Sequence, residues 1–151
     1  MTQPPGWTHG EPQRARPYSA MILGVCGVIL MGIGFYFLLL RPPFLPEDAR
    51  YVRISRAELD AAVPGLARWL QRVFWVLGGY IVATGVLTLY IAMTSFRARS
   101  PRATGVMALA GIASIGGMAT VNFLIDSAFK WPLAAVAALW GLAVALSWRG
   151  H

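Results

Sequence analysis

The chain has 151 residues, of which 57% are hydrophobic and 13% are charged, and its formal net charge is +7. Soluble domains carry about 25% charged residues, so this composition argues against a water-soluble monomer. The apolar residues also come in long uninterrupted blocks, which predict an all-α membrane protein.

The N-terminal end combines a polar segment with the first apolar block. Residues 1–17 are rich in proline and glycine and lack apolar periodicity, which predicts a disordered N-terminal tail. Residues 18–40 contain no charge and reach the ~20 residues that a helix needs to cross ~30 Å of hydrocarbon. This block exceeds the apolar core of a secretory signal, so we expect it to remain as a membrane anchor.

The connection that follows, residues 41–72, is the most individual part of the chain. Its three early prolines end the first helix, because each lacks a backbone donor and restricts its predecessor. Ser55 and Glu58 have the spacing of a capping box, which predicts a short amphipathic helix over residues 56–62. Pro64 and Gly65 interrupt that helix.

An apolar stripe crosses the end of this connection and predicts a helix face buried against a neighbour. The second span is therefore expected to begin outside the membrane, near Pro64, which places Arg68, Trp69 and Arg72 at headgroup level. These three residues are predicted to contact a partner protein or lipid headgroups, or else the arginines snorkel while the stripe packs within the bundle. The stripe comprises Leu59, Val63, Leu66, Leu70, Val73 and Leu77.

Three further apolar blocks complete a predicted four-transmembrane-helix bundle. They cover residues 73–96, 103–125 and 131–148. The membrane domain thus extends over residues 18–148, with an extracytoplasmic loop at 41–72 and a C-terminal tail at 149–151. Small residues on one face of the first span (Ala20, Gly24, Gly32) and of the last span (Ala137, Gly141, Ala145) predict close helix packing.

Arginine placement predicts the topology. The short RARSPR turn at residues 97–102 and the arginines before the first span favour a cytoplasmic location for both termini. Six arginines in the 41–72 connection count against this orientation.

Twelve arginines to one lysine, with abundant alanine and glycine, indicate a GC-rich bacterial genome and hence a multi-pass protein of the bacterial inner membrane.

Charged residues between the third and fourth spans have two interpretations. Asp126 and Lys130 lie in a short connection beside Trp131 and Pro132, which is typical of an exposed ion pair at a membrane surface. Asn122 lies one helical turn inside Asp126, so the alternative is a polar cluster of Asn122 and Asp126 that faces the bundle.

Several chemistries lack the residues that they require. Cys26 is the single cysteine, and His9 and His151 fall in the terminal tails, so neither a thiol pair nor a histidine-ligated metal or haem is expected. We predict no catalytic residue, no cofactor and no nucleic-acid partner. Membrane lipids and a membrane protein partner or second copy are the expected contacts.

The favoured function is a non-catalytic accessory or interaction subunit. A small-molecule or lipid carrier is the first alternative, with a midplane cavity lined by Thr84, Thr88, Ser114 and Thr120. The second is a membrane enzyme with an anion site, in which Arg68 and Arg72 converge with one of the tyrosines of the chain. The candidates are Tyr36, Tyr51, Tyr80 and Tyr90.

The layout of four spans and the glycine-rich second span, VLGGYIVATGVLTLYIA, resemble small bacterial membrane proteins of the DoxX-like type. The resemblance implies a four-helix membrane fold. The segment FLPEDARYV in the long connection departs from that pattern, and no functional residue is carried over.

Overall fold

In a computed structural model, residues 18–98 and 100–149 are described, and all their regular elements are helical. The predicted tail at 1–17 and residues 150–151 lie outside the described residues. The all-α prediction is confirmed. The elements are α1 (Tyr18–Leu39), α2 (Pro46–Val52), α3 (Arg56–Ala62), α4 (Leu66–Ile91), η1 (Ala92–Phe96), α5 (Pro101–Gly111), η2 (Ile112–Gly116), α6 (Gly117–Leu124) and α7 (Lys130–Trp148).

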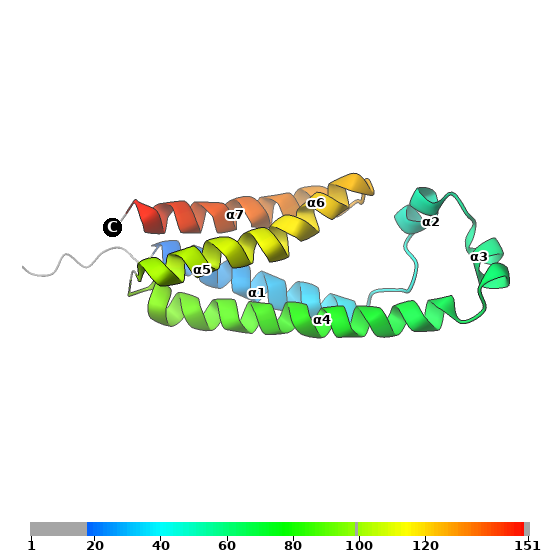
Figure 1. The fold of residues 1–151 in the computed structure, drawn as a ribbon, viewed down its shortest axis with the longest axis horizontal. Helices are drawn as coiled ribbons and strands as arrows, with labels where there is room; N and C mark the ends of the chain where they lie inside the picture. The colour runs from blue at the N-terminus through cyan, green and yellow to red at the C-terminus, as the bar shows by residue number, and fades with distance from the viewer. Residues whose placement is uncertain (1–17, 99, 150–151) are drawn as a thin grey trace, which may run out of the picture.

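Four helices in the described part of the chain are long and apolar enough to cross a membrane, as predicted: Tyr18–Leu39, Leu66–Phe96, Pro101–Leu124 and Lys130–Trp148. Helix α1 lies between α4 and α7, and α5 and α6 pack on α7. The α1/α4 pair and the α5–α6/α7 pair converge where α7 ends (Figure 1). They diverge towards the end that carries α2 and α3, which opens a space between them.

The α1/α4 contact depends on two pairs of glycines. A Cβ added to Gly27 would lie 2.9 Å from the Gly85 oxygen, and one added to Gly34 would lie 2.8 Å from the Gly78 oxygen. The two helices therefore touch backbone to backbone, which only glycine permits. The small-residue faces predicted from the sequence were partly wrong, because a Cβ on Gly32 or Gly141 would meet nothing within 4 Å.

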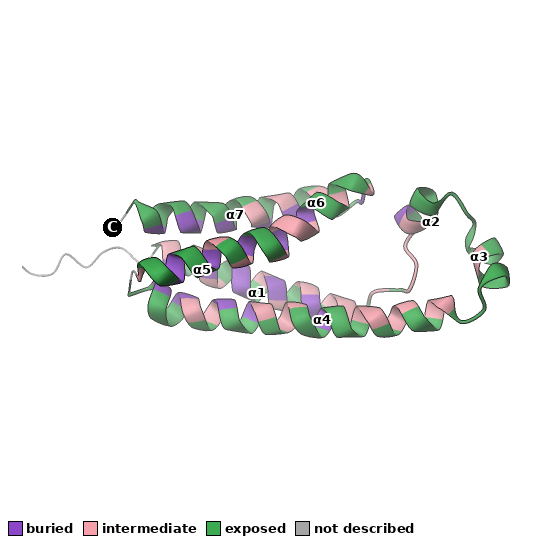
Figure 2. Ribbon diagram, viewed as in Figure 1, coloured by how far each residue is buried: buried purple, intermediate pink, exposed green. Residues whose placement is uncertain are grey.

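The core lies mainly at the end where the helix pairs converge (Figure 2). Leu23, Cys26 and Leu30 of α1 are buried there with Phe96 and Trp140. The hydroxyls of Thr104 and Ser147 form a buried hydrogen bond of 2.9 Å between α5 and α7. Both polar atoms are thereby satisfied within an apolar surrounding.

The 41–72 connection contains two short helices rather than one. Helix α3 begins and ends where the capping box predicted: Ser55 Oγ accepts from the Glu58 amide, and Glu58 accepts from the Ser55 amide. Helix α2 was not predicted. The stripe from Leu59 to Leu77 was predicted to be a buried face, but none of its residues is buried, because α4 packs on α1 through Gly78, Gly85 and Thr88 instead.

The third long helix is interrupted by a π-helical turn, η2, which the sequence analysis did not anticipate. Just before this turn, Gly111 lies against the indole of Trp140 from α7. The indole nitrogen donates to the Met107 oxygen at 2.8 Å. Such π turns widen a helix locally and are a recognised cause of bending.

Candidate functional site

The space between the diverging helix pairs is a cavity of about 640 Å³. Ligand-binding pockets typically have volumes of ~300–1,000 Å³. Its walls come from α1, α4, α6 and α7, and residues of the α1–α2 connection and the start of α2 line one end. Most lining residues are apolar, including Ile33, Leu77, Ile81, Met118 and Leu133, whereas Arg41, Glu47, Asp48 and Ser127 lie together at the α2 end, which we call the mouth.

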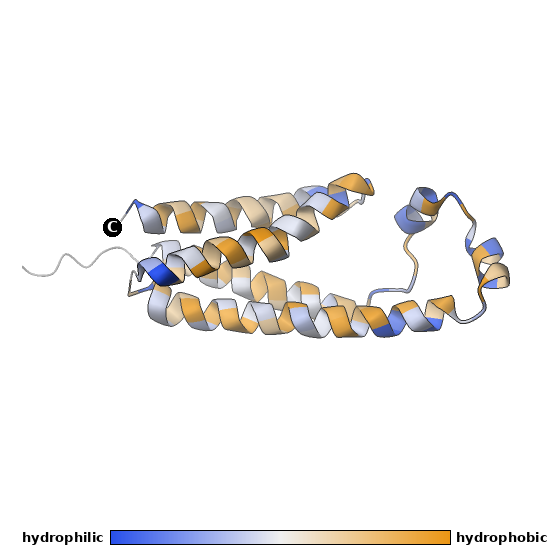
Figure 3. Ribbon diagram, viewed as in Figure 1, coloured by the Kyte–Doolittle hydropathy of each residue, from blue (hydrophilic) through white to orange (hydrophobic). Residues whose placement is uncertain are grey.

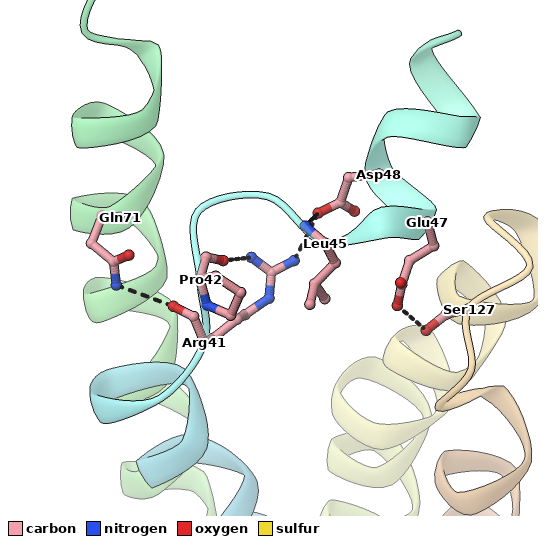
Figure 4. Close-up of polar contacts among 7 residues, drawn as sticks. All are labelled: Arg41, Pro42, Leu45, Glu47, Asp48, Gln71 and Ser127. Atoms are coloured by element: carbon pink, nitrogen blue, oxygen red, sulfur yellow. Dashed lines mark hydrogen bonds and ion pairs between the residues drawn. The ribbon is translucent and has the colours of Figure 1, made fainter. Parts of the chain in front are cut away.

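Arg41 is fixed at this mouth by the way α1 ends. Its amide donates to the Tyr36 oxygen at 2.8 Å, and its own carbonyl accepts from Gln71 Nε2 of α4 at 3.3 Å (Figure 4). The guanidinium carbon lies 3.5 Å from the centre of the Phe74 ring and 5.2 Å from that of Phe37. These cation–π contacts hold the charged group against apolar surface.

Asp48 neutralises Arg41 and at the same time starts α2. One Asp48 oxygen lies 3.5 Å from Arg41 Nη2 and accepts from the Leu45 amide at 2.9 Å. Pro46 occupies the first turn of the helix, where its missing donor costs nothing. The same carboxylate thus serves as a helix cap and as a counter-charge.

Glu47 joins α2 to the opposite helix pair. Its side chain points towards the turn after α6, where Ser127 Oγ donates to Glu47 Oε1 at 3.2 Å (Figure 4). Ser127 Oγ also accepts from the Phe129 amide at 3.2 Å. Glu47 is only 6% exposed, so this contact closes one side of the mouth with a buried carboxylate.

Arg41, Glu47 and Asp48 are the charged residues that line the cavity, and they set the charge at its mouth. Burial lowers the pKa of Arg41, and the Asp48 carboxylate opposes that shift more strongly than Glu47 does. A guanidinium stays protonated in proteins, so the mouth combines one cation with two acidic side chains. Asp48 is paired with Arg41, which leaves Glu47 with the Ser127 hydroxyl as its partner.

The predicted headgroup residues lie outside this cavity. Arg68, Trp69 and Arg72 are exposed on the first turns of α4, where hydrophilic residues interrupt an otherwise apolar helix (Figure 3). Trp69 is 60% exposed. The arrangement gives these side chains free access to lipid headgroups or to a partner.

Asn122 and Asp126 have separate partners. Asn122 lines the cavity, but its Nδ2 donates to the Met118 oxygen of its own helix at 2.9 Å. Asp126 forms an ion pair with Lys130 at the α6–α7 turn and is 71% exposed. The hydrogen bond and the charge of Lys130 lower the pKa of Asp126. The exposed ion pair predicted from the sequence is confirmed.

The residues predicted for a midplane carrier site do not line the cavity. Thr84, Ser114 and Thr120 each donate to a carbonyl one turn earlier in their own helix. Of the four tyrosines considered, Tyr36 lines the cavity, whereas Tyr51, Tyr80 and Tyr90 are at least 65% exposed. Arg68 and Arg72 therefore do not converge with Tyr36 on one pocket.

The sequence analysis missed Arg41, Glu47 and Ser127 as site residues. The sequence did contain a signal for helix α2: Glu47 and Asp48 follow Pro46 directly, and proline and acidic residues are common in the first turn of a helix. Ser127 gave no signal of its own.

Within residues 18–98 and 100–149, no group of three or more histidine, cysteine or acidic side chains could hold a metal.

Comparison with protein-family models, with curated proteins and with solved structures returns no match for this chain. The resemblance to DoxX-like proteins stays a prediction.

Proposed function

We propose that the chain is a non-catalytic, multi-pass integral membrane protein that binds an amphipathic molecule from the bilayer in the cavity between its helix pairs. The observation that carries this proposal is the combination of long apolar walls with a polar mouth at one end. Such a shape matches a molecule with an apolar body and a polar head. This proposed function corresponds to the lipid or small-molecule carrier considered from the sequence. The cavity, however, is lined by other residues than those predicted.

The membrane setting is supported by the outer surface of the helices. Large apolar side chains are exposed on all four long helices, and apolar residues predominate along these helices (Figure 3). Leu39, Leu109, Ile112 and Leu124 are each at least 70% exposed. Apolar surface on this scale is rare on soluble monomers and suits contact with lipid chains.

We further propose the bacterial inner membrane, with both termini in the cytoplasm. The arginine-rich turn between η1 and α5 supports this orientation, because positive charge is retained on the cytoplasmic side. The cavity mouth would then face the periplasm. In a Cys26→Ala background, a cysteine introduced at the exposed Ala57 of α3 should react with an impermeant maleimide on intact cells. The absence of a reaction would support the opposite orientation, with the mouth in the cytoplasm.

Filling the cavity tests the binding function. Gly32 lines the cavity and a Cβ there would meet nothing within 4 Å, so Gly32→Phe should fold normally and place its ring in the ligand space. We expect the purified variant in nanodiscs to lose at least about tenfold in affinity for a single-chain amphiphile such as dodecyl maltoside. Native mass spectrometry of the bound species measures this loss.

Gly79→Phe is the matched control. Gly79 lies on α4, is equally open and does not line the cavity. It should therefore bind the amphiphile as the wild type does. Equal binding by the Gly32→Phe variant would show that the cavity is not the binding site.

The accessory-subunit function remains the second candidate, and the exposed start of α4 favours it. Arg68 and Arg72 flank the exposed Trp69, and no residue of α3 is buried, so a partner could dock there without rearrangement. A stoichiometric partner recovered in a mild-detergent pull-down should be lost when Arg68 and Arg72 are both replaced with alanine. Recovery of that partner by the double variant would contradict this second candidate.

A further inference from the structure

The chemical class of the ligand follows from how the charges at the cavity mouth are paired. Arg41 has three partners: the Asp48 carboxylate at 3.5 Å, the Pro42 carbonyl at 3.3 Å and the face of the Phe74 ring. Its side chain is 11% exposed. A guanidinium already paired with a carboxylate attracts an incoming anion less than an unpaired one does.

Glu47 has no direct ion pair, because Arg41, which interacts with both acidic groups, is paired with Asp48. Within residues 18–98 and 100–149 it forms no ion pair, and its partner is the neutral hydroxyl of Ser127 at 3.2 Å. A buried carboxylate held by one hydroxyl retains much of its desolvation cost. A cation that enters the cavity would offset that cost.

Aromatic side chains line the same end of the cavity. The rings of Tyr36 and Phe129 lie 6.1 Å apart and are tilted by 51°, and both residues line the cavity. Ser127 Oγ, which donates to Glu47 Oε1, also accepts from the Phe129 backbone amide, so Glu47 and the Phe129 backbone share one hydroxyl. Aromatic rings are the surroundings that proteins use for alkylammonium groups.

We propose that the cavity binds an amphiphile whose head carries an ammonium group, with Glu47 as its counter-ion. The apolar body lies between α1, α4, α6 and α7, and the head lies at the mouth beside Tyr36 and Phe129. This assignment rests on the proposed binding function and adds to it the charge of the ligand. An anionic head would meet two carboxylates and one guanidinium that is already neutralised.

Amphiphiles that share one chain and differ only in their head group test the assignment. Full-length protein in nanodiscs is equilibrated with dodecyltrimethylammonium, dodecyl maltoside or dodecyl phosphate, and bound species are counted by native mass spectrometry, with empty nanodiscs as the partition control. We expect the ammonium compound to bind about tenfold or more tightly than the other two. Tighter binding of the phosphate compound would overturn the assignment.

Glu47→Gln isolates the carboxylate. Glutamine keeps a hydrogen-bonding group opposite Ser127, so the fold and the binding of dodecyl maltoside should persist while the preference for ammonium falls at least about tenfold. Glu58→Gln removes one carboxylate from the exposed helix α3 and keeps the capping box, which also accepts glutamine, so it should change nothing. An unchanged ammonium preference in Glu47→Gln would overturn the role of Glu47.

The source of the ammonium group is tested by the lipid itself. Nanodiscs are prepared with phosphatidylethanolamine or with phosphatidylglycerol, and lipid retained by the protein is identified in the same measurement. If the wild type retains phosphatidylethanolamine and Glu47→Gln does not, the site binds a lipid headgroup. If the protein binds dodecyltrimethylammonium but retains no lipid, the site binds single-chain amines. If every amphiphile binds the wild type and Gly32→Phe equally well, the proposed binding function fails as well. If the wild type binds all three head groups equally well but Gly32→Phe binds them more weakly, only the ammonium assignment fails.

Discussion

Gly34→Ala is expected to destabilise the protein by about 1–3 kcal/mol, the range observed for overpacked contacts. A Cβ at Gly34 would lie 2.6 Å from Val82 Cγ2, 2.7 Å from the Val82 nitrogen and 2.8 Å from the Gly78 oxygen. Two of these atoms belong to the α4 backbone, so no side-chain rotation removes the overlap. Helices α1 and α4 must separate, and the contacts along their whole length weaken.

The open glycines of the same two helices provide controls. Gly32→Ala and Gly79→Ala add the same methyl group where nothing lies within 4 Å, so each should change stability by less than about 0.5 kcal/mol. Unfolding by sodium dodecyl sulfate in mixed micelles, followed by circular dichroism, compares the variants. Equal stability of Gly34→Ala and Gly32→Ala would contradict the close backbone contact.

The same glycines show what the sequence could predict about packing. The number of apolar helices and their ranges follow from composition alone, because a spanning helix needs a long uncharged block. Which glycines face a neighbour depends on the rotation of each helix. Gly32 and Gly34 are two residues apart on α1, yet Gly34 contacts α4 and Gly32 opens onto the cavity.

Short helices were predictable where a complete capping motif was present. Ser55 and Glu58 satisfy each other's backbone amides and predict where α3 starts, whereas Pro64 and Gly65 predict that it ends shortly before them. Helix α2 has half of such a motif: Asp48 accepts from the Leu45 amide, but leucine cannot return a side-chain hydrogen bond. The acidic pair after Pro46 was the remaining signal.

The cavity could not be predicted because its lining comes from distant parts of the chain. Glu47 and Ser127 are joined across eighty positions, and neither belongs to a local motif that names the other. Their contact exists because the two helix pairs diverge towards this end and α2 lies over the opening (Figure 1). That divergence is a property of helix packing angles, which apolar composition does not encode.

Trp140→Ala is expected to have the largest effect of any single substitution considered for this chain, about 3–5 kcal/mol of destabilisation. Trp140 is 2% exposed, and its indole nitrogen donates to the Met107 oxygen at 2.8 Å. Its loss leaves a large void between α7 and the third helix. Trp148→Ala, which truncates a tryptophan of α7 that is 57% exposed, is the control and should cost far less in the same micelle unfolding measurement.

Gly111 makes this prediction specific to one contact. A Cβ at Gly111 would overlap the indole of Trp140, so Gly111→Ala alone should destabilise the protein by about 1–3 kcal/mol. In the Trp140→Ala background the overlapping ring is gone, and the new methyl group occupies part of the void. The double variant should therefore be no less stable than Trp140→Ala alone, the non-additivity expected of residues that are in contact. Additive losses would mean that α5 and α7 do not meet at this position.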